Sequence, residues 1–345
     1  MLTAKRSPAQ EKAMSPLLDD LNLMKSLRIF ILILLNILPC TGTIAQSDIT
    51  MATHWNNRAY YNPAFITRTD YLFLYTNVRR QWMGVKGAPE VIDLQTSQYF
   101  RRMNSALGLS LIIDKTGVTR TYNPMFSYAY RIAKKDAWTL SMGLSAGIFS
   151  RSINGSLFEA EYAQDPSLFY YNKKIIKPDV NAGIEFQNMN FIYGASATHL
   201  FSTGRNDSLM MITNHRYAYA IYKNDNPQSF TYTLGIQIIN KDNLTIVEGN
   251  ASLRIKHKPK LIEGTLLRGP QEIIDLGITC RSSRQLTFNF GIMVTSFIRI
   301  GYSYDQSLFS SYYLNTTHEI MLEYRIPARS ASPEVKCGDK EYWYH

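Results

Sequence analysis

The sequence predicts an all-β fold, a transmembrane antiparallel β-barrel of about fourteen strands with long extracellular loops. Three observations predict it. Many segments alternate every second residue between apolar and small or polar side chains, as strands between two different solvents do. Short connections alternate with longer ones along the chain. The composition is 19% charged residues with 23 Tyr and 16 Phe, which is low in charge and rich in aromatics for a soluble domain.

The alternation is clearest near the carboxyl end. Over 298–305, one face carries Ile298, Ile300, Tyr302 and Tyr304, and the other carries Arg299, Gly301, Ser303 and Asp305. Over 318–326, apolar residues and His318 oppose Glu319, Met321, Glu323 and Arg325. Small and polar residues on the second face leave room in a lumen, whereas a soluble barrel would need large apolar residues there.

The same pattern recurs along the chain. The predicted strands are 70–80, 90–99, 105–113, 121–132, 137–149, 177–187, 190–200, 229–239, 244–255, 260–268, 271–281, 285–293, 296–305 and 316–326. Segment 215–223 is either a further strand pair or an ordered outer loop. The longer connections, 81–89, 150–176, 201–228 and 306–315, all fall on one side, which indicates the outer side. An even strand count returns the carboxyl end to the periplasm.

Bulk properties limit the alternatives. Mean hydropathy is −0.19, which is too low for a bundle of membrane helices. A large soluble β-sandwich or β-barrel remains the structural alternative. The net charge of +10 comes from basic residues that are scattered rather than clustered, so no nucleic-acid partner is expected.

Four regions are predicted along the chain. Residues 1–45 hold an upstream extension and, from Met24 to Ala45, a secretory signal peptide with a short apolar core. Lipidation at Cys40 is an alternative, although Pro39 disfavours it. Residues 46–69 are a periplasmic lead-in, 70–326 the barrel and 327–345 a periplasmic tail. The expected location is therefore the cell outer membrane.

Four sequence blocks resemble the PorP/SprF family of the type IX secretion and gliding apparatus. The blocks are YNPAF (61–65) with NVRRQWMGVKGAPE (77–90), ALGLSLIIDKTG (106–117), RIGYSYD (299–305) and THEIMLEYR (317–325). The motif positions are Asn62, Pro63, Arg80, Gln81, Trp82, Gly84, Gly87, Pro89, Gly301, Tyr302, Tyr304, Asp305, His318 and Glu319. The joint order of the four blocks makes the resemblance specific.

The resemblance implies a non-enzymatic outer-membrane component that assists secretion or surface attachment of partner proteins such as adhesins. The implied partners are the periplasmic and motor parts of the type IX machinery, a secreted surface protein and outer-membrane lipid. A passive diffusion channel, a porin, is the alternative. No cofactor is expected, because the His and Cys residues lack metal-ligand spacing and no nucleotide-binding motif or catalytic triad is recognisable.

The structural roles of two motif regions can be narrowed from the sequence. Trp82 with its neighbouring glycines is either a turn anchored by an interfacial aromatic or a loop folded into the lumen or onto a partner. His318 and Glu319 are adjacent in a strand and point to opposite faces, so they cannot form an acid–base pair. Glu319, Glu323 and Arg299 are expected to face the lumen and form structural ion pairs.

Partner contacts are expected in three regions. The lead-in carries several aromatics, which predicts either contact with the machinery or packing into the periplasmic mouth of its own barrel. The long outer segments are expected to carry cargo specificity through Tyr162, Tyr170, Tyr171, Arg216, Tyr217 and Tyr219, or else to form an outer aromatic girdle.

Cys280 and Cys337 should stay unpaired, because they fall at opposite ends of the barrel.

Overall fold

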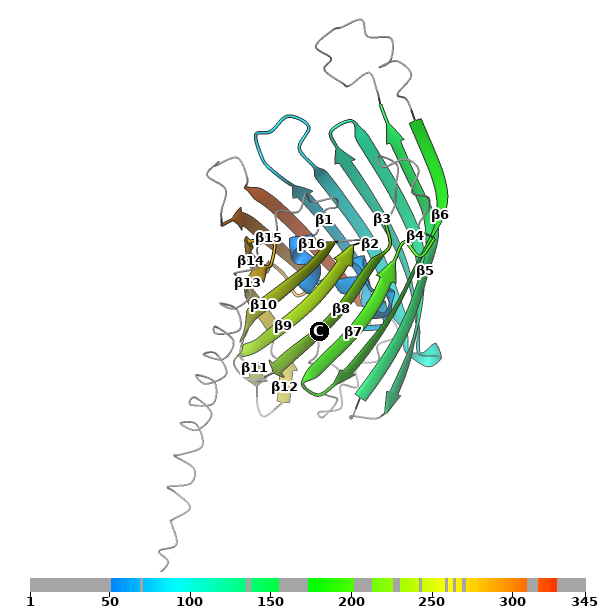
Figure 1. Cartoon of the computed structure of the whole chain (residues 1–345). Helices are drawn as coiled ribbons and strands as arrows, with labels where there is room; N and C mark the ends of the chain where they lie inside the picture. Colours follow the sequence, from blue (N-terminus) through cyan, green and yellow to red (C-terminus); the bar gives the residue numbers. More distant parts are fainter. Residues whose placement is uncertain are drawn as a thin grey trace, which may run out of the picture. The chain divides into compact units, whose positions relative to one another are not determined.

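The computed structural model describes residues 51–68, 71–134, 138–154, 173–201, 213–225, 230–241, 244–257, 260–262, 265–268, 271–308 and 316–327. Over these residues the chain forms a closed antiparallel barrel of fourteen strands, as predicted (Figure 1). The barrel strands are β1 (Tyr71–Arg80), β2 (Glu90–Phe100), β3 (Ser105–Thr116), β4 (Thr119–Lys134), β5 (Trp138–Ile153), β6 (Lys173–Asn188), β7 (Phe191–Thr198), β8 (His215–Asp225), β9 (Phe230–Lys241), β10 (Leu244–His257), β13 (Gln271–Arg281), β14 (Gln285–Met293), β15 (Ile298–Ser307) and β16 (Thr317–Pro327).

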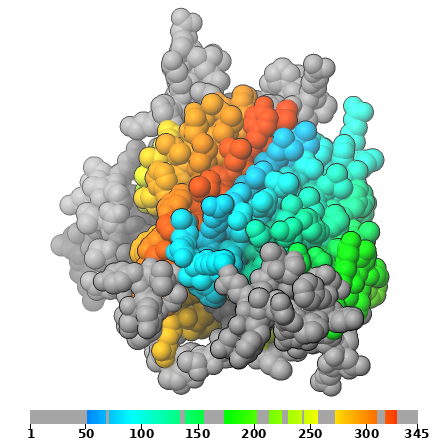
Figure 2. Space-filling model, turned by 90° about the horizontal axis from the view of Figure 1, so that it is seen from above, coloured from blue at the N-terminus to red at the C-terminus, as the bar shows by residue number. Residues whose placement is uncertain are grey.

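The first and last strands close the barrel. Strand β1 pairs with β16 from Tyr71 opposite Pro327 to Arg80 opposite His318. Figure 2 shows the red strand of the carboxyl end lying beside the blue strand of the amino end. We call the end where β1 begins and β16 ends the terminal rim, and the end that carries the β1–β2, β5–β6 and β7–β8 connections the loop rim.

Two predicted segments differ in the structure. Segment 215–223, for which a strand pair or an outer loop was expected, is a single strand: it lies within β8, which pairs with β7 and β9. Segment 260–268 is not a barrel strand; it forms a separate two-stranded sheet of β11 (Lys260–Ile262) and β12 (Thr265–Arg268). These two differences leave the strand count unchanged, but they reverse the direction of the predicted strands 229–239 and 244–255. The paired ends of β9 and β10, Lys241 and Leu244, therefore lie at the loop rim.

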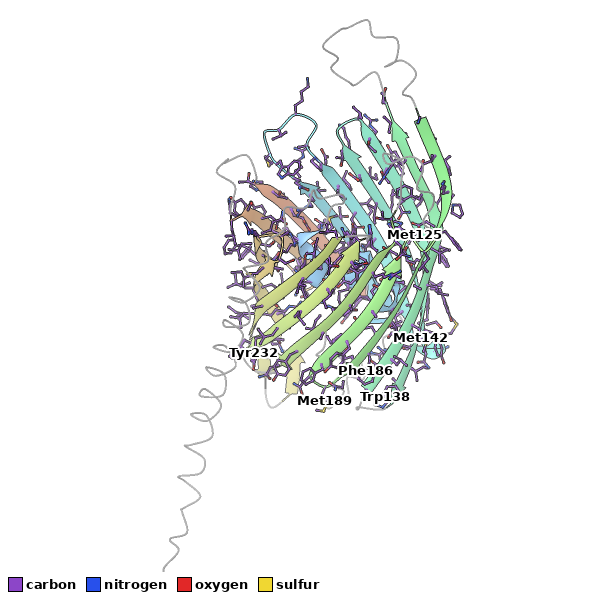
Figure 3. The ribbon with its side chains drawn as sticks, in the orientation of Figure 1. Met125, Trp138, Met142, Phe186, Met189 and Tyr232 are labelled. Carbon is purple, nitrogen blue, oxygen red and sulfur yellow. The ribbon has the colours of Figure 1, made fainter. Side chains whose placement is uncertain are left out.

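The two faces of the wall follow the predicted alternation. Outward positions are exposed and apolar, as at Leu107, Leu109, Phe126, Met142, Leu144, Phe288, Ile320 and Leu322. Aromatics gather near the terminal rim, where Trp138 stacks on Phe186 with ring centroids 6.1 Å apart (Figure 3). The described residues include no helix with the length and apolar character needed to cross a membrane.

The lumen contains the amino-terminal part of the described chain. Three 3-10 helices, η1 (Ala52–Trp55), η2 (Arg58–Tyr60) and η3 (Pro63–Arg68), lie inside the ring of strands (Figure 1). Most side chains from Met51 to Thr67 are buried against the inner wall. A run with a proline and no two-residue period cannot form a wall strand, and its aromatics and polar groups find partners inside instead. We call residues 51–67 the lumen segment.

Candidate functional site in the barrel lumen

The lumen segment is held at its amino-terminal end by one carboxylate on β16. Glu319 accepts hydrogen bonds from the backbone N–H groups of Ala52 and Thr53 at 2.8 and 2.9 Å. It also accepts the Thr53 hydroxyl at 2.5 Å and the Asn77 side chain at 2.6 Å. Two consecutive backbone donors on one carboxylate fix the direction and register of the segment, because charge-assisted hydrogen bonds are short and directional.

The Glu319 carboxylate begins a chain of alternating charges around the lumen. Arg79 bridges Glu319 at 2.9 Å and Asp305 at 2.7 Å. Arg281 continues from Asp305 at 3.5 Å to Glu248 at 2.6 Å. The chain returns to the lumen segment through His54, whose Nε2 lies 2.8 Å from Glu248. Five strands thus clamp η1 from both sides, and each buried charge has an opposite charge beside it, as a low-dielectric interior requires.

The NPA motif docks the middle of the lumen segment on the opposite wall. The Asn62 side chain donates to the Tyr219 hydroxyl at 2.8 Å and to the Ile184 carbonyl at 3.2 Å. Its own oxygen accepts the Ala64 N–H at 3.0 Å, which shapes the turn into η3. Gly143 and Gly183 form the floor of this contact, since a Cβ on either would overlap Pro63 or Asn62. The motif is therefore a docking element for the segment.

A buried ion pair fixes η2 to β6. Arg58 donates to Glu185 at 3.0 Å, and the Tyr219 hydroxyl donates to the same carboxylate oxygen at 2.5 Å. The guanidinium also lies 4.7 Å from the centroid of the Phe65 ring. Because Asn62 bonds to the same Tyr219 hydroxyl, η2 and the NPA motif form one network with the wall.

An aromatic cluster seals the space between the lumen segment and β8. Tyr61 stacks on Tyr217 at 4.7 Å between ring centroids and meets Tyr219 edge-on at 5.8 Å. Trp55 packs over Gly235 of β9, where a side chain would collide with the indole.

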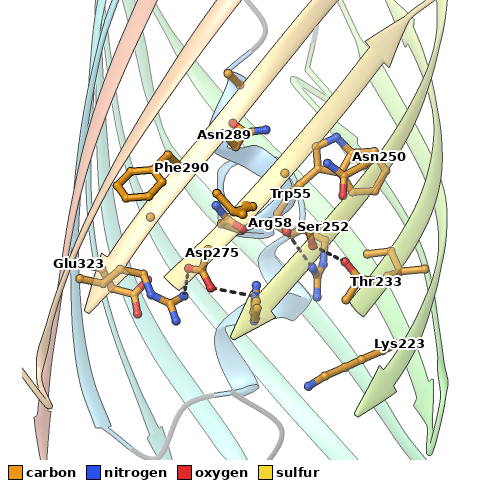
Figure 4. Close-up of a pocket in the computed structure, with 18 of the residues that line it drawn as sticks. Trp55, Arg58, Lys223, Thr233, Asn250, Ser252, Asp275, Asn289, Phe290 and Glu323 are labelled. Atoms are coloured by element: carbon orange, nitrogen blue, oxygen red, sulfur yellow. Dashed lines mark hydrogen bonds and ion pairs between the residues drawn. The ribbon is translucent and has the colours of Figure 1, made fainter. Parts of the chain in front are cut away.

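One part of the lumen stays open near the terminal rim. A cavity of ≈ 110 Å³ lies between the lumen segment and the wall from β8 to β16 (Figure 4). Arg254 and Arg299 line it and pair with Glu272 at 3.3 and 3.0 Å. Arg299 also lies 3.3 Å from Asp275. Arg299 therefore forms lumenal ion pairs as predicted, with Glu272 and Asp275 of β13, whereas Glu319 pairs with Arg79.

The motif loop between β1 and β2 lies on the loop rim. Its Gln81 N–H bonds to the Pro89 carbonyl at 2.9 Å, and Gly87 accepts the N–H of Gly117 in the β3–β4 turn at 2.9 Å. Gly84 and Gly87 have positive φ of 96° and 75°, which explains glycine at both positions. Trp82 is exposed, and a cavity of ≈ 270 Å³ lies within the loop. The loop folds against its own rim and not into the lumen.

The remaining motif residues divide between the two faces of the wall. Asp305 and Glu319 face inward, and Gly301 leaves space for Met321. Arg80, Tyr302, Tyr304 and His318 face outward near the loop rim. There the Tyr302 hydroxyl lies 2.6 Å from His318 Nδ1. This placement agrees with the prediction that His318 and Glu319 cannot act together.

The partner-binding residues predicted in the outer segments have different positions. Tyr162, Tyr170 and Tyr171 lie outside the described residues. Tyr217 and Tyr219 are not in an outer loop; they are buried in the lumen against Tyr61. Arg216 is exposed on the outer face of β8. Cys280 is free, and Cys337 lies outside the described residues.

Several residues of the site have no counterpart among the predicted positions. Glu185, Glu248, Arg281, His54 and Arg58 carry the contacts of the lumen segment. A usable signal was the run of inward glycines on predicted strands, combined with an aromatic-rich, non-periodic segment just before the barrel. Among the described residues, no group of His, Cys, Asp or Glu side chains could hold a metal ion.

Comparison with known protein families shows to which family this chain belongs. Residues 43–324 match the family model described as type IX secretion system membrane protein PorP/SprF. The chain belongs to the PorP/SprF family. The matched range includes the lumen segment and the barrel as far as residue 324 of β16, so the contacts of the lumen segment described above lie within the family region. No curated protein matches the chain.

Solved outer-membrane barrels resemble the chain at low identity. The toluene transporter TodX of Pseudomonas putida is 8% identical, with a TM-score of 0.45 over 78% of this chain and 92% of that one. The outer membrane protein Omp33 of Acinetobacter baumannii is 9% identical, with a TM-score of 0.41 over 74% and 98%. A FadL homologue of Pseudomonas aeruginosa is 9% identical, with a TM-score of 0.41 over 77% and 93%.

Proposed function

We propose that the protein is a non-enzymatic outer-membrane component of the type IX secretion and gliding machinery. In this role it assists the secretion or surface attachment of a partner protein such as an adhesin. Membership of the PorP/SprF family supports the link to this secretion system. The filled lumen supports a docking role, because a barrel occupied by its own chain offers its rims, and not its interior, to other molecules.

The observation that carries the proposal is the number and kind of contacts made by the lumen segment. It is held by carboxylates on two opposite walls, Glu319 and Glu185. It is also held by the aromatic cluster on β8 and by a hydroxyl contact of 2.7 Å between Thr67 and Ser141. Contacts distributed around the wall oppose spontaneous release, since several must break together.

A passive diffusion channel is the rival function. A porin needs a continuous water-filled path, as large outer-membrane barrels provide. The lumen segment bonds to two opposite walls, at Glu319 and Glu185, and so lies across the lumen of the described barrel, beside a cavity of ≈ 110 Å³ at the terminal rim. The rival therefore requires that the lumen segment move out of the way.

Planar-bilayer recording separates the two functions. The full chain should give no steady ion conductance. A variant with residues 51–67 replaced by a Gly/Ser linker of equal length should conduct, because the wall is closed without the segment. The matched control replaces exposed residues 82–88 of the loop in the same way and should stay silent. Steady conductance by the full chain would favour the porin.

The partner role needs its own measurement. Affinity purification of the protein from its native membrane should enrich secretion components or a surface protein. Exchanging connections 154–172 and 199–214 for those of a family paralogue should change which surface protein is displayed, because loops on a rigid scaffold commonly carry recognition. Unchanged display after the exchange would place specificity elsewhere on the barrel.

A further inference from the structure

The lumen segment has a direction that can be followed through the barrel. Its first residues contact the wall near the loop rim: Ala52 and Thr53 bond to Glu319, the third residue from the loop-rim end of β16. Arg79, which bonds to the same carboxylate, is one residue from the loop-rim end of β1. The described chain therefore begins in the loop-rim part of the lumen.

The later residues descend step by step. Asn57 donates to Gln95 at the middle of β2, at 2.9 Å. Arg58 reaches Glu185, three residues from the terminal-rim end of β6. Thr67 reaches Ser141, three residues from the terminal-rim end of β5. The wall contacts thus begin nearer the loop rim at Glu319 and end nearer the terminal rim at Ser141.

The carboxyl end of the segment is tethered at the terminal rim. Helix η3 ends at Arg68, and β1 begins at Tyr71 on that rim. Two intervening residues span at most about 11 Å from Arg68 to Tyr71, so this end cannot leave the lumen without opening the β1 strand. Only the amino-terminal end of the segment is free to lead elsewhere.

We infer that the chain enters the lumen through the loop rim, so that the amino-terminal side of Met51 opens to the cell exterior. Longer connections mark the outer side of such barrels. Those at the loop rim include 154–172 and 199–214, whereas the terminal rim has short connections such as 189–190 and 226–229 besides the longer 258–270. An anchor at the exterior, Glu319, is then the first contact to break when the segment is withdrawn.

A sided labelling experiment tests the polarity. A flexible Gly/Ser extension of about 25 residues with one central cysteine is inserted immediately before Met51, in a Cys280→Ser, Cys337→Ser background. Fully extended, the half of the insert between the cysteine and Met51 spans about 40 Å, longer than the apolar band of about 25 Å, so the cysteine can reach water on whichever side the chain opens. A matched chain carries the same extension after Pro327. Intact and permeabilised cells are treated with a membrane-impermeant maleimide.

The amino-terminal cysteine should be labelled on intact cells at least tenfold more than the carboxyl-terminal one, and both should be labelled after permeabilisation. Heat-modifiable migration on gels shows that each barrel is folded. Labelling of the amino-terminal cysteine only after permeabilisation overturns the inference. Absence of label on a folded barrel under both conditions also overturns it, since the extension would then open to neither rim.

Discussion

Two parts of the barrel wall present different kinds of side chain to the lumen. The wall from β2 to β6 presents small side chains and glycines, such as Ser141, Gly143 and Gly183, and η3 covers it. The wall from β10 to β16 presents charges, among them Arg254, Asp275 and Arg299, which line the cavity and form ion pairs with one another along the wall. Small residues admit a second layer of backbone, whereas long charged residues neutralise each other and need no cover.

At η1 the charged wall is also covered by backbone of the lumen segment. Near the loop rim the charged wall also binds backbone, because Glu319 has two acceptor oxygens and uses them on Ala52 and Thr53. The same type of residue therefore either anchors the lumen segment or lines an open cavity, depending on whether a backbone donor lies within reach. Substitutions on the two walls should consequently have different effects.

The largest effect is expected for Glu319→Ala on the anchoring part of the wall. It leaves Arg79 without one of its two carboxylates and two backbone N–H groups without acceptors. Breaking a buried, hydrogen-bonded charge pair costs about 3–5 kcal/mol, so the lumen segment should release and the barrel should show frequent conductance openings in planar bilayers. Glu323→Ala is the matched control. Glu323 lies four residues further along β16 on the same inward face, and it pairs with Arg325 of its own strand. Equal opening frequencies in both variants would show that Glu319 holds the lumen segment no more strongly than the cavity residue Glu323 does.

An intermediate effect is expected for Gly143→Val on the small-residue wall. The new side chain collides with the backbone of Pro63 and Ala64, so η3 must shift. Overpacking of this kind costs about 1–3 kcal/mol and should expose the lumen segment to proteolysis in detergent. Gly277→Ala tests the other wall, where the added methyl meets only side chains and lies 3.3 Å from the nearest atom. If both variants show wild-type proteolysis, the close approach of the NPA motif to β5 is not required.

The smallest effect is expected for Arg254→Gln in the cavity. Glu272 and Asp275 keep Arg299 as a partner, so no carboxylate is left without a cation. Because both carboxylates keep a cation, the thermal unfolding midpoint should fall less than in Glu319→Ala. A loss of stability as large as that of Glu319→Ala would mean that the cavity wall is as tightly coupled to the lumen segment as the anchor is.

The sequence alone determined the barrel and the facing of its residues. Over β15 and β16, a two-residue period between lipid and lumen leaves one assignment of faces, and Arg299, Asp305 and Glu319 lie inward as the period requires. Periodicity failed at β8 for a physical reason. Its inward residues Tyr217 and Tyr219 are aromatic because they face Tyr61 and not water, so the strand lacked the polar face expected of a lumen wall.

The tertiary structure decided what fills the lumen and in which direction. Local sequence shows that residues 51–67 are irregular and rich in aromatics and amides, but it cannot show which distant strands supply their partners. Glu185, Glu248 and Glu319 come from β6, β10 and β16, and only closure of the barrel brings them around one short segment. The role of the NPA motif follows from the same closure, because the glycines that receive it lie about 80 to 120 residues further along the chain.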